Sequence, residues 1–177
     1  MPNAALPAAM RVSDAVNTGD LSCLGDCVTD DFVDHGSPFP IPPGPQGYRT
    51  ILTFVTQVLR IRYDIADVME TDDRIVLRAT AHGAAVASVH GEAVAGRPYV
   101  MESIHIYRTE GDRLAEHWGV RDEMGVLVQI GATAAPGPSG RGRGHHADDH
   151  PRLTQSAATG TGGRHGIPHL RSISAGG

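Results

Sequence analysis

The sequence of 177 residues contains no lysine, so arginine and histidine are its only basic side chains. Schiff-base catalysis and attachment of pyridoxal phosphate both need a lysine amine, and the sequence therefore excludes both. Chemistry at a carbonyl group would have to proceed by acid and base. Cysteine is nearly absent as well. Cys23 and Cys27 stand four residues apart, without the histidine or second cysteine pair that would complete a zinc site, and we interpret them as packing thiols.

Long hydrophobic runs are also lacking. The longest, such as residues 51–55, are far too short to span a membrane, and the N-terminal MPNAALPAAM lacks the basic start and apolar core of a signal peptide. We therefore expect a cytoplasmic protein without a membrane partner. The length and the ordinary shares of apolar (40%) and charged (20%) residues predict one globular domain.

The last part of the chain, residues 132–177, contains ten glycines and no aromatic residue. Such a segment cannot bury enough apolar surface to offset its ordering entropy, so we expect residues 1–131 to form the domain and 132–177 a disordered tail. The HHADDH run at 145–150 has metal-binding residue types. Flexible histidine-rich tracts usually bind metal loosely, however, and we expect no functional metal site there.

Charge argues against a nucleic-acid partner. Residues 1–131 contain ten arginines and 18 acidic residues, a net charge of −8, which is a poor match for a phosphate backbone. The GRGRG segment at 140–144 has only two arginines, too few to indicate RNA binding.

Periodicity predicts helices first and long strands after them. Apolar residues recur at helical spacing over 6–16 and most clearly over 48–59, and Asp20 is a plausible N-cap for a short helix at 21–28. A loop with five prolines separates these helices at 38–45. From Tyr63 the period changes to two. Turn residues then divide strands at about 74–87, 99–108 and 113–120, and Asp122 and Glu123 start a terminal helix. This order is typical of an α+β fold with one curved sheet.

Three segments carry a resemblance to a known family: MESIHIYRTEGDRLAEHWGVRDEMGVLVQIGA at 101–132, VDHGSPFPIPPGPQGYR at 33–49, and GRPYVMESIHIYR across the start of the long strand. The chain resembles the SnoaL-like polyketide cyclases over nearly all of residues 5–131. The resemblance implies a curved mixed or antiparallel sheet wrapped around the N-terminal helices. Such a cone encloses an apolar pocket that holds a polycyclic polyketide without metal or organic cofactor.

The resemblance also implies catalytic residues. In the family an aspartate directly after the EHW triplet acts as general acid and base in an intramolecular aldol ring closure, beside a histidine on the preceding strand. His105 matches that histidine. The position of the aspartate is Gly119 here. Glycine can neither remove nor return a proton, so the residue at this position cannot perform the main catalytic role.

Candidate replacements follow from strand parity. His105 shares a strand face with Met101 and Ser103, an apolar setting where a neutral imidazole is a suitable base. His117 shares a face with Gly119 and would stand opposite His105 if the hairpin register is even and unbulged. Either histidine could instead make a purely structural hydrogen bond.

Asp34 is a candidate for a displaced carboxylate beside the proline loop, although it could belong to a solvated acidic turn with Asp30 and Asp31. The remaining candidates are predicted to contact substrate, and several could equally fill the core. They are His35, Tyr48, Phe54, Met101, Ser103 and Gly119.

These features favour a cofactor-independent cyclase or isomerase of a polyketide-type polycyclic molecule. One alternative is a noncatalytic small-molecule-binding or scaffolding protein, which the glycine at position 119 motivates. A diverged hydroxylase or epoxide hydrolase is another. Members of such a family usually self-associate through the convex or edge surface of the sheet, so a homodimer or higher homo-oligomer is expected.

Overall fold

Five strands form one mixed sheet in the order β1-β5-β4-β3-β2 in the computed structural model, which describes residues 2–135 and 137. Neighbouring strands from β2 to β5 are antiparallel, whereas β1 pairs with β5 in parallel. Their bounds are β1 Val28–Asp34, β2 Arg62–Glu70, β3 Arg74–Ala84, β4 Pro98–Glu110 and β5 Arg113–Arg121. The predicted α+β class is confirmed.

The sheet buries one face of each long strand. Side chains of β4 alternate between buried and exposed along nearly its whole length, as a half-buried strand requires. The buried set includes Met101, Ser103, His105 and Tyr107. Strand parity therefore decides which residues can reach the interior.

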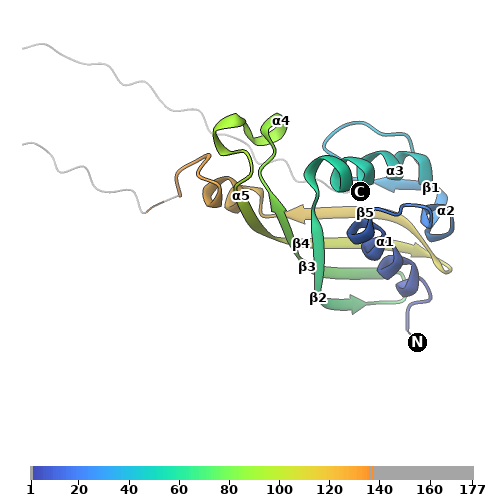
Figure 1. The fold of residues 1–177 in the computed structure, drawn as a ribbon. Coiled ribbons are helices and arrows are strands. Elements are labelled where there is room, and N and C mark those ends of the chain that lie inside the picture. Colours follow the sequence, from blue (N-terminus) through green and yellow to red (C-terminus); the bar gives the residue numbers. More distant parts are fainter. Residues whose placement is uncertain (1, 136, 138–177) are drawn as a thin grey trace, which may run out of the picture. The chain divides into compact units, whose positions relative to one another are not determined.

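Helices α1 (Leu6–Thr18) and α3 (Pro45–Thr53) lie against one face of the sheet, while α4 (Ala87–His90) and α5 (Glu123–Gln129) lie together at one end of it (Figure 1). α3 continues as a π-helical stretch, η1 (Phe54–Leu59), and a short 3-10 turn, η2 (Glu92–Val94), follows α4. α5 begins at Asp122 and Glu123 as predicted, and Asp122 also caps it, since its Oδ1 accepts a hydrogen bond from the Gly125 N–H at 2.8 Å.

Three sequence predictions need correction. The short helix α2 spans only Leu24–Cys27, because Asp20 accepts a hydrogen bond from the Ser22 N–H and thereby stabilises a turn before the helix. Residues after Cys27 form strand β1, which the sequence did not predict. Strand β3 ends at Ala84 because the chain turns into α4 three residues later. Cys27 is fully buried, as expected for a packing thiol.

Two glycines let the proline loop close onto α3. Gly44 has φ +86°, which favours glycine, and it precedes Pro45 at the first position of the helix. A Cβ on Gly47 would lie only 1.7 Å from the Pro42 carbonyl oxygen. The loop backbone therefore packs directly against the first turn of α3.

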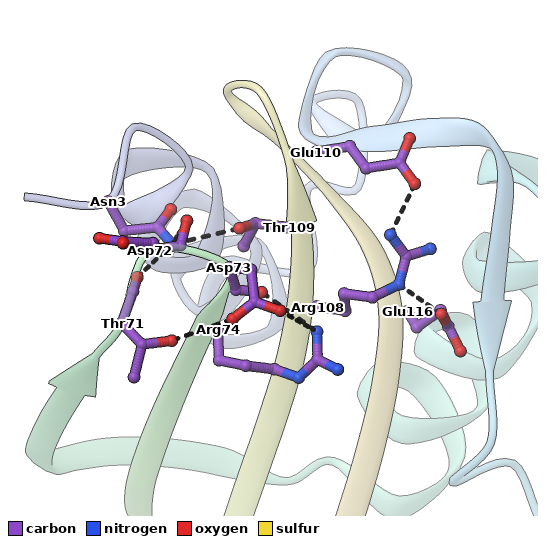
Figure 2. A network of polar contacts seen from close by, with 9 residues as sticks. All are labelled: Asn3, Thr71, Asp72, Asp73, Arg74, Arg108, Thr109, Glu110 and Glu116. Atoms are coloured by element: carbon purple, nitrogen blue, oxygen red, sulfur yellow. Dashed lines mark hydrogen bonds and ion pairs between the residues drawn. The ribbon is translucent and has the colours of Figure 1, made fainter.

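Polar contacts fix the end of the sheet farthest from α5. Figure 2 shows Asn3 hydrogen-bonded to Thr109 and to the β2–β3 turn, and the Arg108 guanidinium between the carboxylates of Glu110 and Glu116. Glu116 also accepts a hydrogen bond from His35. The EHW glutamate thus links β4, β5 and the residue that follows β1.

Several sequence predictions concern the C-terminal part of the chain. Most of the expected tail, 132–177, with its HHADDH and GRGRG runs, lies outside the described residues. No helix among residues 2–135 is long and apolar enough to cross a membrane.

Candidate active site

A cavity of about 470 Å³ opens between the sheet and the helices that cover it. Most of its lining is apolar and comes from η1, α5 and the start of β4, with Phe54 and Met101 among the contributors. Arg121, His90 and Glu123 add charged or titratable groups. A mostly apolar pocket with a few polar groups is typical of small-molecule sites.

A second, smaller space of about 40 Å³ lies next to this cavity and shares Ile51, Val55, Tyr63 and Arg121 with it. Asp34, His105 and His117 line the smaller space, together with Tyr48 and Tyr107. It has room for one or a few water-sized groups. The titratable residues therefore gather at one side of an apolar cavity.

A continuous chain of hydrogen bonds joins these residues. The Asp34 Oδ1 lies 2.8 Å from Nδ1 of His117, whose Nε2 lies 3.0 Å from Nδ1 of His105. The His105 Nε2 lies 3.2 Å from the Ser103 hydroxyl, which lies 3.1 Å from the carbonyl oxygen of Ala79. The side chains of Asp34 and His117 are only 3% and 4% exposed, so bulk water does not compete for these bonds.

Counting protons shows that this hydrogen-bond chain has two protonation states. Its four hydrogen bonds need four protons, but two neutral imidazoles and one serine hydroxyl supply only three. With three protons, His105 holds its proton on Nδ1 and leaves Nε2 free to accept one. With four, every bond is satisfied and the pair of imidazoles carries one positive charge beside the Asp34 carboxylate. The arrangement can therefore take up one proton and return it.

The register of the sheet explains this contact and corrects one prediction. His105 pairs with Gly119 across β4 and β5, and His117 pairs with Tyr107, because an irregularity between Arg108 and Thr109 shifts the hairpin. His117 is therefore diagonal to His105 and not directly opposite it. The two rings still stack, with centroids 5.3 Å apart and planes 13° from parallel.

Parallel pairing of β1 with β5 brings in Asp34. Asp34 lies beside His117 in the register, and the His35 N–H donates to the His117 carbonyl oxygen at 2.8 Å. Asp34 therefore points to the interior, whereas His35 points outward, contacts Glu116 and stacks on Trp118 with centroids 4.7 Å apart. Asp34 is not part of a solvated turn, and Asp30 and Asp31 are exposed residues of β1 itself.

The electrostatics keep Asp34 charged and His105 uncharged. Burial alone would raise the pKa of Asp34, but the hydrogen bonds and charge of His117, the Gly36 N–H and the Arg121 charge hold that pKa below its ordinary value. Burial, with help from the charges of His117 and Arg121 and against that of Asp34, lowers the pKa of His105 to about 3. Near neutral pH the His105 imidazole is thus uncharged.

The structure brings some predicted site residues together and not others. Ser103 hydrogen-bonds His105, the Tyr48 hydroxyl lies 3.3 Å from that of Tyr107, and Phe54 and Met101 line the larger cavity. His35 lines neither space. Gly119 faces the interior opposite His105.

Sequence reasoning missed Tyr63, Tyr107 and Arg121. Tyr63 meets the His105 ring edge to face, with centroids 5.1 Å apart, and Arg121 lines both spaces. Strand parity was an available signal for Arg121, since it stands two residues after Gly119. Among residues 2–135, no group of three or more histidine, cysteine or acidic side chains is arranged to hold a metal ion.

Fold and site together define an α+β domain with a buried hydrogen-bond chain of titratable groups beside an apolar cavity. The chain belongs to the SnoaL-like polyketide cyclase family, whose model matches residues 8–130. Among curated proteins, none matches the chain.

Solved structures agree with this family. IdmH, a candidate polyketide cyclase from Streptomyces antibioticus, is 26% identical with a TM-score of 0.59, covering 71% of this chain and 96% of its own. TsrD from Streptomyces laurentii is 24% identical with a TM-score of 0.63, covering 73% and 96%. AclR, a candidate hydroxylase from Streptomyces galilaeus, shares the fold at 18% identity and a TM-score of 0.60, covering 75% and 87%.

Proposed function

We propose that this protein is a cofactor-independent cyclase or isomerase that acts on a polyketide-type polycyclic molecule by acid–base chemistry. The observation that carries the proposal is the buried chain from Asp34 through His117 to His105 beside an apolar cavity. A catalytic imidazole oriented by a second group, which is in turn oriented by a carboxylate, follows a general pattern of acid–base sites.

In the proposed reaction, His105 removes a proton from a carbon next to a substrate carbonyl. The proton moves to Nε2, where the 3.2 Å contact with Ser103 is the longest of the three bonds that link the four side chains. The resulting enolate carbon attacks a second carbonyl of the same molecule, and the new alkoxide takes the proton back from Nε2. The hydrogen-bond chain with three protons is then the base form of the site, and the same chain with four protons is the acid form. This mechanism needs no carboxylate at position 119.

The charge on Asp34 supports both forms. In the three-proton state, Asp34 and His117 fix the tautomer of His105 that leaves Nε2 unprotonated. In the four-proton state, the Asp34 carboxylate stabilises the positive charge that the two imidazoles share. We propose a positioning role for Asp34 and His117 and direct contact with substrate for His105.

The test uses the full chain with a panel of anthraquinone-type polyketide acid esters, followed by mass-resolved chromatography and binding titration. We expect His105→Gln to lower turnover at least about 100-fold while ligand binding is retained, since general acid–base groups contribute on this scale. Asp34→Asn should lower kcat more than it changes KM and shift the pH profile. Asp31→Asn, at an exposed position in the same strand, is the matched control.

A second function has a specific observation in its favour, because Gly119 stands where the resembling cyclases have their catalytic aspartate. In this case the protein binds a polycyclic ligand without changing it. Saturable binding to wild type without turnover of any panel member would support the binding protein and reject the cyclase.

A further inference from the structure

Arg121, at the end of β5, occupies the space that Gly119 leaves open. A Cβ added to Gly119 would lie 2.8 Å from Nη2 of Arg121 and 3.1 Å from its Cζ. Such a side chain would have to displace the guanidinium group. A carboxylate at position 119 and the present position of Arg121 therefore exclude each other.

The position of Arg121 is special among the cavity residues. It lines both the large cavity and the small space around His105, and the other residues shared by the two are Ile51, Val55 and Tyr63. Arg121 is thus the one charged side chain at the junction, within the described part of the chain. A ligand that extends from the apolar cavity toward His105 would come near this side chain.

Gly36 and Tyr63 take up only part of the hydrogen-bonding capacity of this guanidinium, and its hydrogen bond to the Tyr63 hydroxyl acts against burial to lower the pKa of that hydroxyl. A guanidinium has five N–H donors, and Nη1 donates to the Gly36 carbonyl oxygen at a long 3.4 Å. No ion pair within 4.0 Å joins Arg121 to a carboxylate among residues 2–135 and 137. Asp34 is charged and near enough to respond to Arg121, but its Oδ1 accepts from His117 and from the Gly36 N–H.

A half-buried cation without an ion-pair partner is costly unless a ligand supplies the partner. Guanidinium binds carboxylates and other anionic oxygens with paired, charge-assisted hydrogen bonds. Glu123 also lines the large cavity but is exposed, so water screens its charge. The cavity walls are mostly apolar, and the Arg121 guanidinium lies where the two spaces meet. This arrangement suits a flat apolar ring system that carries one negatively charged oxygen.

We propose that Arg121 binds an anionic oxygen, a carboxylate or an ionised phenol or enol, on an otherwise apolar polycyclic ligand. This deepens the proposed function by naming the charge of its ligand, and it rests on that proposal only for the presence of a polycyclic ligand, not for turnover. Arg121 is a specificity-determining residue that places the anionic end of the ligand beside His105.

Two matched probe pairs test this by calorimetric titration of the full chain. The first pair is anthraquinone-2-carboxylate and its methyl ester. The second is 2-hydroxyanthraquinone, at a pH where its phenol is ionised, and its methyl ether. Wild type is expected to bind the anionic member of at least one pair about ten-fold or more tightly than the neutral member, and the pair that responds identifies the source of the charge.

Arg121→Met keeps the length of the side chain and removes its charge, so it should abolish the preference for the anion and leave the affinity for the neutral probe within about two-fold. Gly119→Asp should also abolish the preference for the anion, because the new side chain displaces the guanidinium. It replaces Arg121→Met as the test variant if Arg121→Met does not fold. Arg78→Met, at a position 48% exposed and paired with Glu102, is the matched control and should preserve the preference.

Equal affinity within both pairs, absence of saturable binding, or a preference that persists in Arg121→Met would overturn the inference. A preference lost in Arg121→Met, in a protein that turns over none of the ester panel, supports Arg121 and rejects the cyclase. Turnover that depends on His105 without any preference for an anion supports the cyclase and rejects the role of Arg121.

Discussion

At the scale of single residues, the site depends on an imidazole that burial keeps uncharged. His105 is 9% exposed and is surrounded by His117, Tyr63 and Ser103. Burial is the main cause of its low pKa, positive charge at Arg121 or His117 lowers that pKa further, and the Asp34 carboxylate partly compensates. The same burial that makes His105 available as a base therefore makes the folded protein sensitive to acid.

This sensitivity gives a stability prediction. The unfolded chain binds a proton at His105 near pH 6.5, but the folded chain does so only near pH 3, so the free energy of unfolding falls as pH drops below about 6.5. The loss attributable to His105 is about 2 kcal/mol between pH 8 and pH 5, at about 1.4 kcal/mol per pH unit in the steep range. Urea denaturation of wild type and His105→Gln across this range measures it.

The exposed His82, which pairs with Asp64, provides the control for that comparison. His82→Gln should keep the pH dependence of wild type. Parallel curves for wild type and His105→Gln would show that His105 is not held uncharged by the fold.

Part of the site could be predicted from single residues and from the strand face on which each one lies. His105, Ser103 and Met101 were placed on one buried face because alternation along β4 is regular. Asp34 was not, since its partner His117 lies 83 residues away and only the pairing of β1 with β5 brings them together. The bulge near Arg108 was likewise invisible, because it depends on how the hairpin closes and not on any one residue type.

At the scale of elements, the start of α3 depends on a close approach between helix and loop. A Cβ on Gly47 would overlap the Pro42 carbonyl oxygen, which belongs to backbone and cannot rotate away. We expect Gly47→Ala to lower the free energy of unfolding by about 2 kcal/mol or more, a magnitude usual for overpacking. Gly25→Ala in α2, with open space around it, should be neutral or stabilising by up to about 1 kcal/mol.

Chemical denaturation of the two alanine variants checks this directly. Similar stability of both variants would mean that the loop does not pack on α3 as described. The comparison also tests the site, because α3 supplies Tyr48 and Ile51 to the space around His105.

The elements themselves were predictable in proportion to their local regularity. α1, α3 and the strands β3 to β5 have long periodic patterns, and their predicted positions agree with the structure to within a few residues. β1 is short and its neighbour β5 is distant in sequence, so no local pattern indicated it. α4 has four residues and no apolar stripe, and it too went unpredicted.

At the scale of the whole molecule, the homodimer stays a prediction, and the outer face of the sheet suggests where it forms. Ile104 and Val120 are paired across β4 and β5 and are 42% and 66% exposed, on the face opposite His105. Neighbouring exposed apolar side chains are typical of interaction surfaces. We expect the protein to elute at twice the chain mass and Ile104→Glu to elute as a monomer.

Met69→Glu is the control, because Met69 is 54% exposed on β2 and lies away from that pair. Size-exclusion chromatography with light scattering measures both masses. A monomeric wild type, or a dimer unaffected by Ile104→Glu, would contradict this placement of the interface.

The central claim is that His105 exchanges a proton with a carbon acid held in the cavity. The direct measurement is the rate of deuterium incorporation, followed by mass spectrometry in D₂O, into the acidic carbon of a β-keto ester of the anthraquinone type bound to the full-length protein. The account predicts that wild type accelerates this exchange at least about 100-fold over His105→Gln at equal ligand occupancy. Equal exchange rates in the two proteins would contradict it.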